Sequence, residues 1–242
     1  MMRRTLCFAA STLLAAAMSA AAQAAPPQWG GSLTLSSNHL LRGVSRSSND
    51  PALSAQVQVQ SLDGWLASLW VSSSRPRVQD STTVEFAGTL GYARRIDQDW
   101  TLVGSYTHYE KPWGFRPGFY RYDEFTADLH WRESLLLSVS YSPDLSRYAP
   151  VYGPVWNRNA WTYEATWQQE LRPHLRAWAG AGYYDLSDLY DDGYWYGSVG
   201  LGWRQGRWQL DASYVIPDHT ATRLSYPGAA RRRVLAALSV SF

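Results

Sequence analysis

The chain has 242 residues and a formal net charge of +2, with 22 Lys and Arg against 20 Asp and Glu. Almost all of the positive charge is on arginine, and the near-neutral balance argues against the basic footprint of a nucleic-acid-binding protein. A single cysteine excludes a disulfide framework, while thirteen tryptophans and sixteen tyrosines are a heavy aromatic load of the kind found at membrane interfaces.

The N-terminal segment has the pattern of a secretory signal peptide. Arg3-Arg4 forms a short basic region, an apolar run covers residues 6–18, and Ala22-Gln23-Ala24 supplies a small-x-small cleavage site. The sequence therefore predicts a signal peptide over residues 1–24 and one mature domain over residues 25–242. No later stretch approaches the ~20 apolar residues that a membrane helix needs, so a membrane-spanning chain of this sequence would cross as strands.

The mature region alternates apolar and polar residues with a period of two, which predicts about twelve β-strands. They cover residues 33–44, 51–60, 65–72, 84–92, 100–107, 124–131, 135–142, 161–168, 175–183, 195–203, 208–216 and 234–242. Short connections near Asp63, Asp97, Glu133, Glu170 and Gln205 alternate with long ones near Ser47, Arg77, Pro112, Pro150, Asp188 and Pro217. An even strand count with this alternation predicts an all-β fold, a transmembrane antiparallel up-and-down β-barrel.

Aromatic residues fall into two bands on this map. One band lies near the short turns and the other near the long loops: Trp65, Trp100, Trp131, Trp203 and Trp208 in the first, and Tyr106, Tyr141, Trp161, Tyr163, Tyr183 and Tyr214 in the second. Two aromatic girdles are typical of barrels in the outer membrane. A soluble β-sandwich also alternates, but it has no reason to separate its aromatics or to sort its loops by length.

The chain ends on a strand whose last residue, Phe242, lies on the apolar face. An open edge of this kind is a liability in a soluble protein, whereas a closed barrel pairs its last strand with its first. The ending resembles the C-terminal signature of bacterial outer-membrane proteins, which implies that Phe242 is read by the barrel-assembly machinery. We therefore expect export to the outer membrane of a Gram-negative cell. Outer-membrane lipid and lipopolysaccharide would be partners, with Arg231-Arg232-Arg233 contacting lipid phosphates.

If the apolar face meets lipid, the other face lines a lumen. Its lining is mostly small and polar, with charged or amide side chains predicted at Arg42, Gln56, Gln58, Glu85, Glu124, Asp128, Glu164, Arg176 and Asp211. Small polar residues hold water, so we expect a passive channel for small polar solutes or ions, and the excess of acids predicts a modest cation preference. The alternative is a structural barrel whose lumen is filled by its own side chains.

Two further readings concern chemistry. Ser36-Ser37-Asn38-His39 supplies the residue types of an outer-membrane lipid hydrolase, but neighbours in a strand point to opposite faces, so we expect no enzyme and no catalytic residue. A loop near Asp188 carries four carboxylates that could contact a cation or a sugar: Asp185, Asp188, Asp191 and Asp192. Their spacing does not match an EF-hand, and we predict neither a metal site nor a cofactor.

The opening hairpin carries a resemblance to a known family. Its residues are Arg42-Gly43-x-Ser45, the pair Pro51-Ala52, the ending Trp70-x-Ser72 and the following Val84-Glu85-Phe86 with Gly91-Tyr92. This pattern resembles the TorF-type porin family of proteobacterial outer-membrane proteins, long described as conserved proteins of unknown function. Departures occur at Asn38, His39, Ser54-Ala55 and Ala87. The resemblance covers residues 32–92 and implies an outer-membrane porin.

Overall fold

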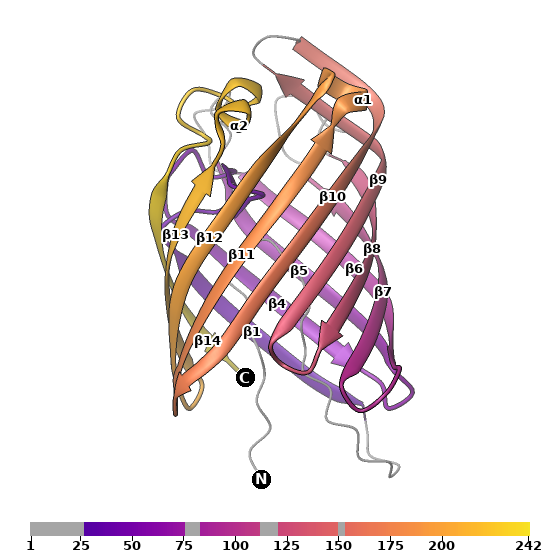
Figure 1. Ribbon diagram of the computed structural model, residues 1–242, viewed down its shortest axis with the longest axis vertical. Coiled ribbons are helices and arrows are strands. Elements are labelled where there is room, and N and C mark those ends of the chain that lie inside the picture. The colour runs from indigo at the N-terminus through magenta and orange to yellow at the C-terminus, as the bar shows by residue number, and fades with distance from the viewer. Residues whose placement is uncertain (1–26, 76–82, 112–120, 150–152) are drawn as a thin grey trace.

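The computed structural model describes residues 27–75, 83–111, 121–149 and 153–242. Twelve antiparallel strands close into one barrel (Figure 1). In chain order they are β1 (Gln28–Ser36), β4 (Ala52–Gln60), β5 (Trp65–Ser74), β6 (Thr83–Arg95), β7 (Trp100–Glu110), β8 (Tyr122–Trp131), β9 (Leu135–Ala149), β10 (Gly153–Arg172), β11 (Leu175–Leu186), β12 (Asp192–Gln205), β13 (Trp208–Pro217) and β14 (Arg233–Ser241). The remaining elements are the short strands β2 (Leu40–Leu41) and β3 (Val44–Ser45) and the helices α1 (Ser187–Tyr190) and α2 (His219–Leu224). Neither of these helices is long and apolar enough to cross a membrane.

The first and last strands close the barrel. β1 pairs antiparallel with β14 from Ser32↔Ser241 to Ser36↔Ala237. Beyond that ladder, the Gly31 amide donates to the Phe242 carbonyl oxygen at 2.9 Å, and the Phe242 amide donates to the Gly31 carbonyl oxygen at 3.0 Å. The terminal phenylalanine therefore sits in the closing seam, and the predicted twelve-strand barrel is confirmed.

Alternating exposure along each strand separates an apolar outer face from a polar inner one. β13 alternates exposed and buried residues without a break. Leu210 is 50% exposed on the outside, whereas its neighbour Asp211 is 3% exposed on the inside. The outer face would be costly in water, because it presents large apolar side chains around the whole wall.

The two ends of the barrel differ. The C-terminus lies at the end with the short turns, here called the turn end, and α1 and α2 lie at the opposite loop end (Figure 1). Aromatic side chains pair on the outer surface near both ends. Trp65 and Tyr92 have ring centroids 5.2 Å apart near the turn end, and Tyr141 and Trp161 are 4.6 Å apart near the loop end.

The predicted elements differ from the structure in three places. The first strand was expected over residues 33–44, but β1 ends at Ser36 and the chain then leaves the wall. The connection near Asp188, expected to be long, is only the stretch between Leu186 and Asp192, because β11 and β12 extend past their predicted ends. The connection near Pro150 was also expected to be long, but β9 extends to Ala149 and β10 begins at Gly153, so that the strands cover most of the predicted loop. The long loops predicted near Arg77 and Pro112 fall outside the described residues.

Candidate functional site

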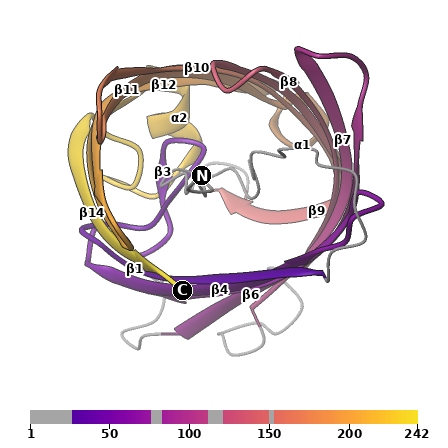
Figure 2. The same ribbon diagram turned by 90° about the horizontal axis from the view of Figure 1, so that it is seen from below.

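Residues 37–51, here called the inward segment, fold into the barrel. Figure 2 shows β3 and the chain around it within the ring of strands. The Asn38 side-chain oxygen holds the base of the hairpin by accepting from Ser45 Oγ at 2.8 Å and from Ser47 Oγ at 3.1 Å. The hairpin turns at Arg42 and Gly43, which have φ values of 50° and 78°. A Cβ on Gly43 would come within 3.1 Å of Tyr196 Cβ, so both the positive φ and the close approach to the far wall favour glycine.

Arg42 anchors the tip of this hairpin to the opposite wall. Its Nη2 donates to Glu124 Oε2 of β8 at 2.5 Å, and Ser142 Oγ donates to the same oxygen at 3.2 Å. The guanidinium carbon lies 4.5 Å from the ring centroid of Tyr184 on β11. The side chains of Arg42 and Glu124 are only 5% and 8% exposed. This corrects the predicted position of Arg42, which belongs to the inward segment and not to a wall strand.

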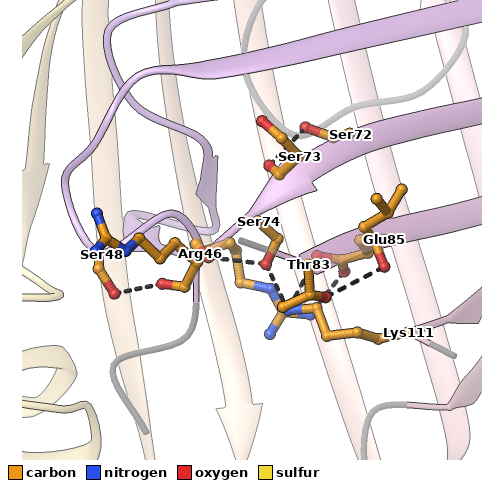
Figure 3. Close-up of polar contacts among 10 residues, drawn as sticks. Arg46, Ser48, Ser72, Ser73, Ser74, Thr83, Glu85 and Lys111 are labelled. Atoms are coloured by element: carbon orange, nitrogen blue, oxygen red, sulfur yellow. Dashed lines mark hydrogen bonds and ion pairs between the residues drawn. The ribbon is translucent and has the colours of Figure 1, made fainter. Parts of the chain in front are cut away.

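A second anchor is formed around Glu85 (Figure 3). Arg46 Nη2 donates to Glu85 Oε1 at 2.8 Å, and Lys111 Nζ lies 3.9 Å from Glu85 Oε2. Lys111 also donates to Ser74 Oγ at 2.5 Å, and that hydroxyl donates to the Arg46 carbonyl oxygen at 3.0 Å. Glu85 on β6 therefore neutralises two cations that come from outside the strands.

The loop end of the interior is filled by apolar and aromatic side chains. Tyr109 and Tyr122 stack with centroids 4.6 Å apart, and Tyr184 is fully buried. Leu189 of α1 and Leu224 of α2 belong to the same buried cluster. The inward segment is packed against this cluster through Val44. The loop end is thus a hydrophobic core inside a barrel.

His39 lies in the inward segment beside an aromatic residue of β5. Its ring lies edge-on to Trp70, with centroids 5.4 Å apart. Burial lowers the pKa of His39 to about 4, against the opposing attraction of Glu85, so the imidazole is neutral at ordinary pH. A neutral, aromatic-packed histidine is a structural group here.

The turn end of the interior is polar and carries smaller side chains. Thr126 and Ser140 share a hydrogen bond of 2.9 Å across β8 and β9. Arg176 Nη2 of β11 donates to Asp211 Oδ1 of β13 at 3.2 Å. Gln56 and Gln58 of β4 face inward and stay partly exposed. This half of the interior is polar, with some side chains partly exposed and others, such as Asp211, buried.

The remaining predicted lumen residues also lie on the inner face. Glu164 of β10 accepts from Tyr196 Oη at 2.6 Å, and Asp128 of β8 is 7% exposed. That these groups line a solute path stays a prediction. Sequence reasoning missed Arg46 and Lys111, because both were taken for loop residues and neither carries a local signal of its inward partner.

The stretch Ser36 to His39 forms no catalytic arrangement. The Ser36 hydroxyl donates to the Ala52 carbonyl oxygen at 3.3 Å, and the Ser37 hydroxyl accepts from the Ala236 amide at 3.0 Å. Both serines therefore serve the seam around β1, and neither contacts the His39 ring. Asn38 is used in the hairpin base described above.

A histidine–carboxylate pair that was not predicted from the sequence lies on the outer face. His108 Nδ1 is 2.6 Å from Asp123 Oδ1, which also accepts from Tyr106 Oη at 2.7 Å. Within the described residues, the contacts of His108 and Asp123 bring in no serine, threonine or cysteine. The pair therefore lacks the nucleophile that hydrolysis would need.

The four aspartates at the loop end point to separate partners. Asp185 accepts from the Ser187 amide at 2.9 Å, and Asp188 accepts from the Asn159 amide at 2.9 Å. Asp192 pairs with Arg223, and Asp191 takes the left-handed position after α1 with φ 55°. In the described ranges, no three His, Cys, Asp or Glu side chains come together as a metal site.

Comparisons with known proteins agree with this architecture. The NanC porin structure has a TM-score of 0.53 at 11% identity, covering 88% of this chain and 98% of that one. The KdgM porin gives a TM-score of 0.53 at 7% identity over the same shares of the two chains. At such identities the likeness shows a shared barrel fold. No curated protein matches the sequence. The family model described as "Bacterial protein of unknown function (Gcw_chp)" matches residues 20–241, and the chain belongs to that family.

Proposed function

We propose that this protein is an outer-membrane channel for passive diffusion of small polar solutes. The observation that carries the proposal is the partly exposed polar lining at the turn end of a closed barrel whose outer face is apolar. Such a wall is stable only in lipid, and such a lining holds water. The porin fold of NanC and KdgM and the TorF-type resemblance support the same function. The turn end would then face the periplasm and the loop end the outside.

The inward segment determines how wide that channel is. Because it reaches from β1 to β6, β8 and β11, it narrows the loop end and leaves the turn end as the wider part of the path. A permanently plugged, structural barrel is the competing function. An enzyme is the less favoured alternative, because the ring of His39 packs on Trp70 and the ring of His108 contacts the carboxylates of Asp123 and Glu110.

The membrane and assembly partners belong to the same proposal. Arg231 and Arg232 are exposed where β14 begins, in a position suited to lipopolysaccharide phosphates, whereas Arg233 donates to the Ala229 carbonyl oxygen at 2.7 Å. Phe242 lies in the seam with its side chain 65% exposed, accessible to the assembly machinery before closure.

Single-channel recording of the refolded mature protein in a planar bilayer tests the proposal. Discrete, reproducible conductance steps are expected. A barrel that is folded, as judged by heat-modifiable migration, but electrically silent would overturn the channel and favour the structural barrel. Release of fatty acid from phospholipid vesicles by the same preparation would overturn it in favour of an enzyme.

A further inference from the structure

Trp178 is a tryptophan on the inner face of the barrel, outside both aromatic bands. It lies on β11 with the same facing as Arg176 and Tyr184, and its side chain is partly exposed. Other tryptophans near the turn end, such as Trp203 and Trp208, are exposed on the outer face. A tryptophan that anchors a barrel at the membrane–water interface lies on the outer face. The inward position of Trp178 therefore needs another explanation.

The wall around Trp178 makes room for its ring. Trp178 pairs with Gly200 on β12, and a Cβ added to Gly200 would lie 2.3 Å from Trp178 Cζ2. The indole thus lies against bare backbone. The same arrangement recurs where Tyr196 covers Gly182, so two rings are laid flat on the inner wall of β11 and β12.

A chain of polar groups runs beside the indole. The Arg176 guanidinium carbon is 5.4 Å from the Trp178 ring centroid. Arg176 contacts Asp211, as described above, and Asp211 Oδ2 accepts from Gln209 Nε2 at 2.5 Å. Gln209 Oε1 in turn accepts from Arg204 Nη2 at 2.8 Å. Guanidinium, carboxylate and amide groups are therefore held in fixed orientations next to an aromatic surface.

This position is separate from the inward segment. Six residues of β11 separate Trp178 from Tyr184, which contacts Arg42, and this spacing corresponds to about 20 Å along the strand. The groups around Trp178 thus belong to the polar turn end and not to the buried cluster.

We propose that Trp178, Arg176 and Arg204, which are partly exposed, form a saccharide-binding site at the turn end of the lumen, and that the buried Gln209 and Asp211 hold the two arginines in place. The face of an aromatic ring carries partial negative charge and attracts the polarised C–H groups on one side of a pyranose. The two guanidinium groups offer several N–H donors in fixed orientations, which match the oxygens of neighbouring sugar hydroxyls. An apolar surface with a few oriented polar groups is the usual composition of a small-molecule site. The inference rests on the proposed channel and names its solute class.

The alternative is that the ring only shields the backbone of Gly200, which is a known structural use of aromatics in sheets. The two explanations differ in what they predict for a ligand. A shielding role predicts lower barrel stability in Trp178→Ala with unchanged behaviour toward sugars. A binding role predicts a loss of sugar affinity that Trp178→Phe largely restores.

The test measures block of ion current by maltotriose added to the turn side, with sorbitol as an open-chain polyol that cannot stack as a ring. Wild-type current should fall with maltotriose and not with sorbitol, and Trp178→Ala should raise the half-blocking concentration about tenfold. Trp203→Ala, on the outer face of the neighbouring strand, is the matched control and should leave block unchanged. Equal block of wild type and Trp178→Ala, or equal action of the two solutes, would overturn the site.

Calorimetric titration of the detergent-solubilised barrel with maltotriose keeps this inference separate from the proposed function. A conducting barrel that binds no maltotriose would overturn the saccharide site and leave the channel standing. A silent barrel that binds maltotriose, with weaker binding in Trp178→Ala, would overturn the channel and support the site.

Discussion

The ion pair between Arg42 and Glu124 controls whether the inward segment stays docked, and Arg42→Ala tests this directly. Removing one partner of a buried ion pair costs about 3–5 kcal/mol, because the remaining charge is left without compensation. The Arg42 and Glu124 side chains are 5% and 8% exposed, so the buried range applies. At about 1.4 kcal/mol per factor of ten, the docked-to-undocked ratio of the segment should fall by roughly two to three and a half orders of magnitude.

Single-channel recording reads out this change. Arg42→Ala should show a higher open probability or a larger conductance level than wild type, with heat-modifiable migration confirming a folded barrel. The matched control is Arg75→Ala, which breaks the 2.9 Å pair with Asp50 at the end of the same segment. That pair is 44% and 47% exposed, and such pairs contribute only about 0–1 kcal/mol, so the control should behave like wild type. If Arg42→Ala conducts like Arg75→Ala, the ion pair does not hold the segment.

Three further outcomes are expected. Burial lowers the pKa of Lys111 to about 8 despite the attraction of Glu85, so the ammonium loses its proton as pH rises from 7 to 9. Because a positive charge is lost, the reversal potential in a salt gradient should shift toward cation selectivity over that range. A Lys111→Arg channel should show no such shift. Phe242→Ser should reduce the heat-modifiable fraction recovered from outer membranes, whereas Phe125→Ser, an equally outward phenylalanine within a strand, should not reduce it as far. Mass spectrometry of the exported protein should give a chain that begins at Ala25, and a retained leader would refute the predicted cleavage.

The wall of the barrel could be predicted from the sequence because strand geometry imposes a period of two on any sheet with lipid on one side and water on the other. Leu210 and Asp211 illustrate the pattern, since adjacent residues meet opposite solvents. The period of two did not predict the inward segment. Leu40, Leu41 and Val44 are apolar and extend the apparent first strand, but they pack inside the barrel, and periodicity does not distinguish an apolar residue facing lipid from one facing an internal core.

The partners of the buried charges could not be predicted either. Arg46 and Glu85 are 39 residues apart, and Arg42 and Glu124 are 82 apart. Such pairings depend on which strands of the barrel wall the inward segment reaches. The local sequence around each residue does not specify those strands. Trp178 interrupts the alternation of residues 175–183 in the sequence, but its packing against Gly200 can be recognised only once the register of β11 and β12 is known.

The charge inside the barrel bears on its selectivity, and here the structure changes the expectation. The predicted cation preference set five acids, Glu85, Glu124, Asp128, Glu164 and Asp211, against Arg42 and Arg176 alone. Among the described residues, the inner face also holds Arg46, Lys111 and Arg204, so that five bases there oppose these five acids. Since selectivity in such pores follows the unbalanced charge along the path, the reversal potential of wild type in a KCl gradient should lie near zero at neutral pH.

Removing one charged residue from the inner face should then change ion selectivity according to the net charge that is left. Arg204→Gln removes a partly exposed cation at the turn end and should shift the reversal potential toward cations, while Arg94→Gln, an exposed arginine on β6 that is absent from the inner-face contacts, should not. A wild-type channel that strongly prefers cations would mean that the buried arginines of the inward segment do not face the permeation path. The conducting route would then run beside Asp128 and Glu164, and the pairs of Arg42 and Arg46 would serve only to hold the segment in place.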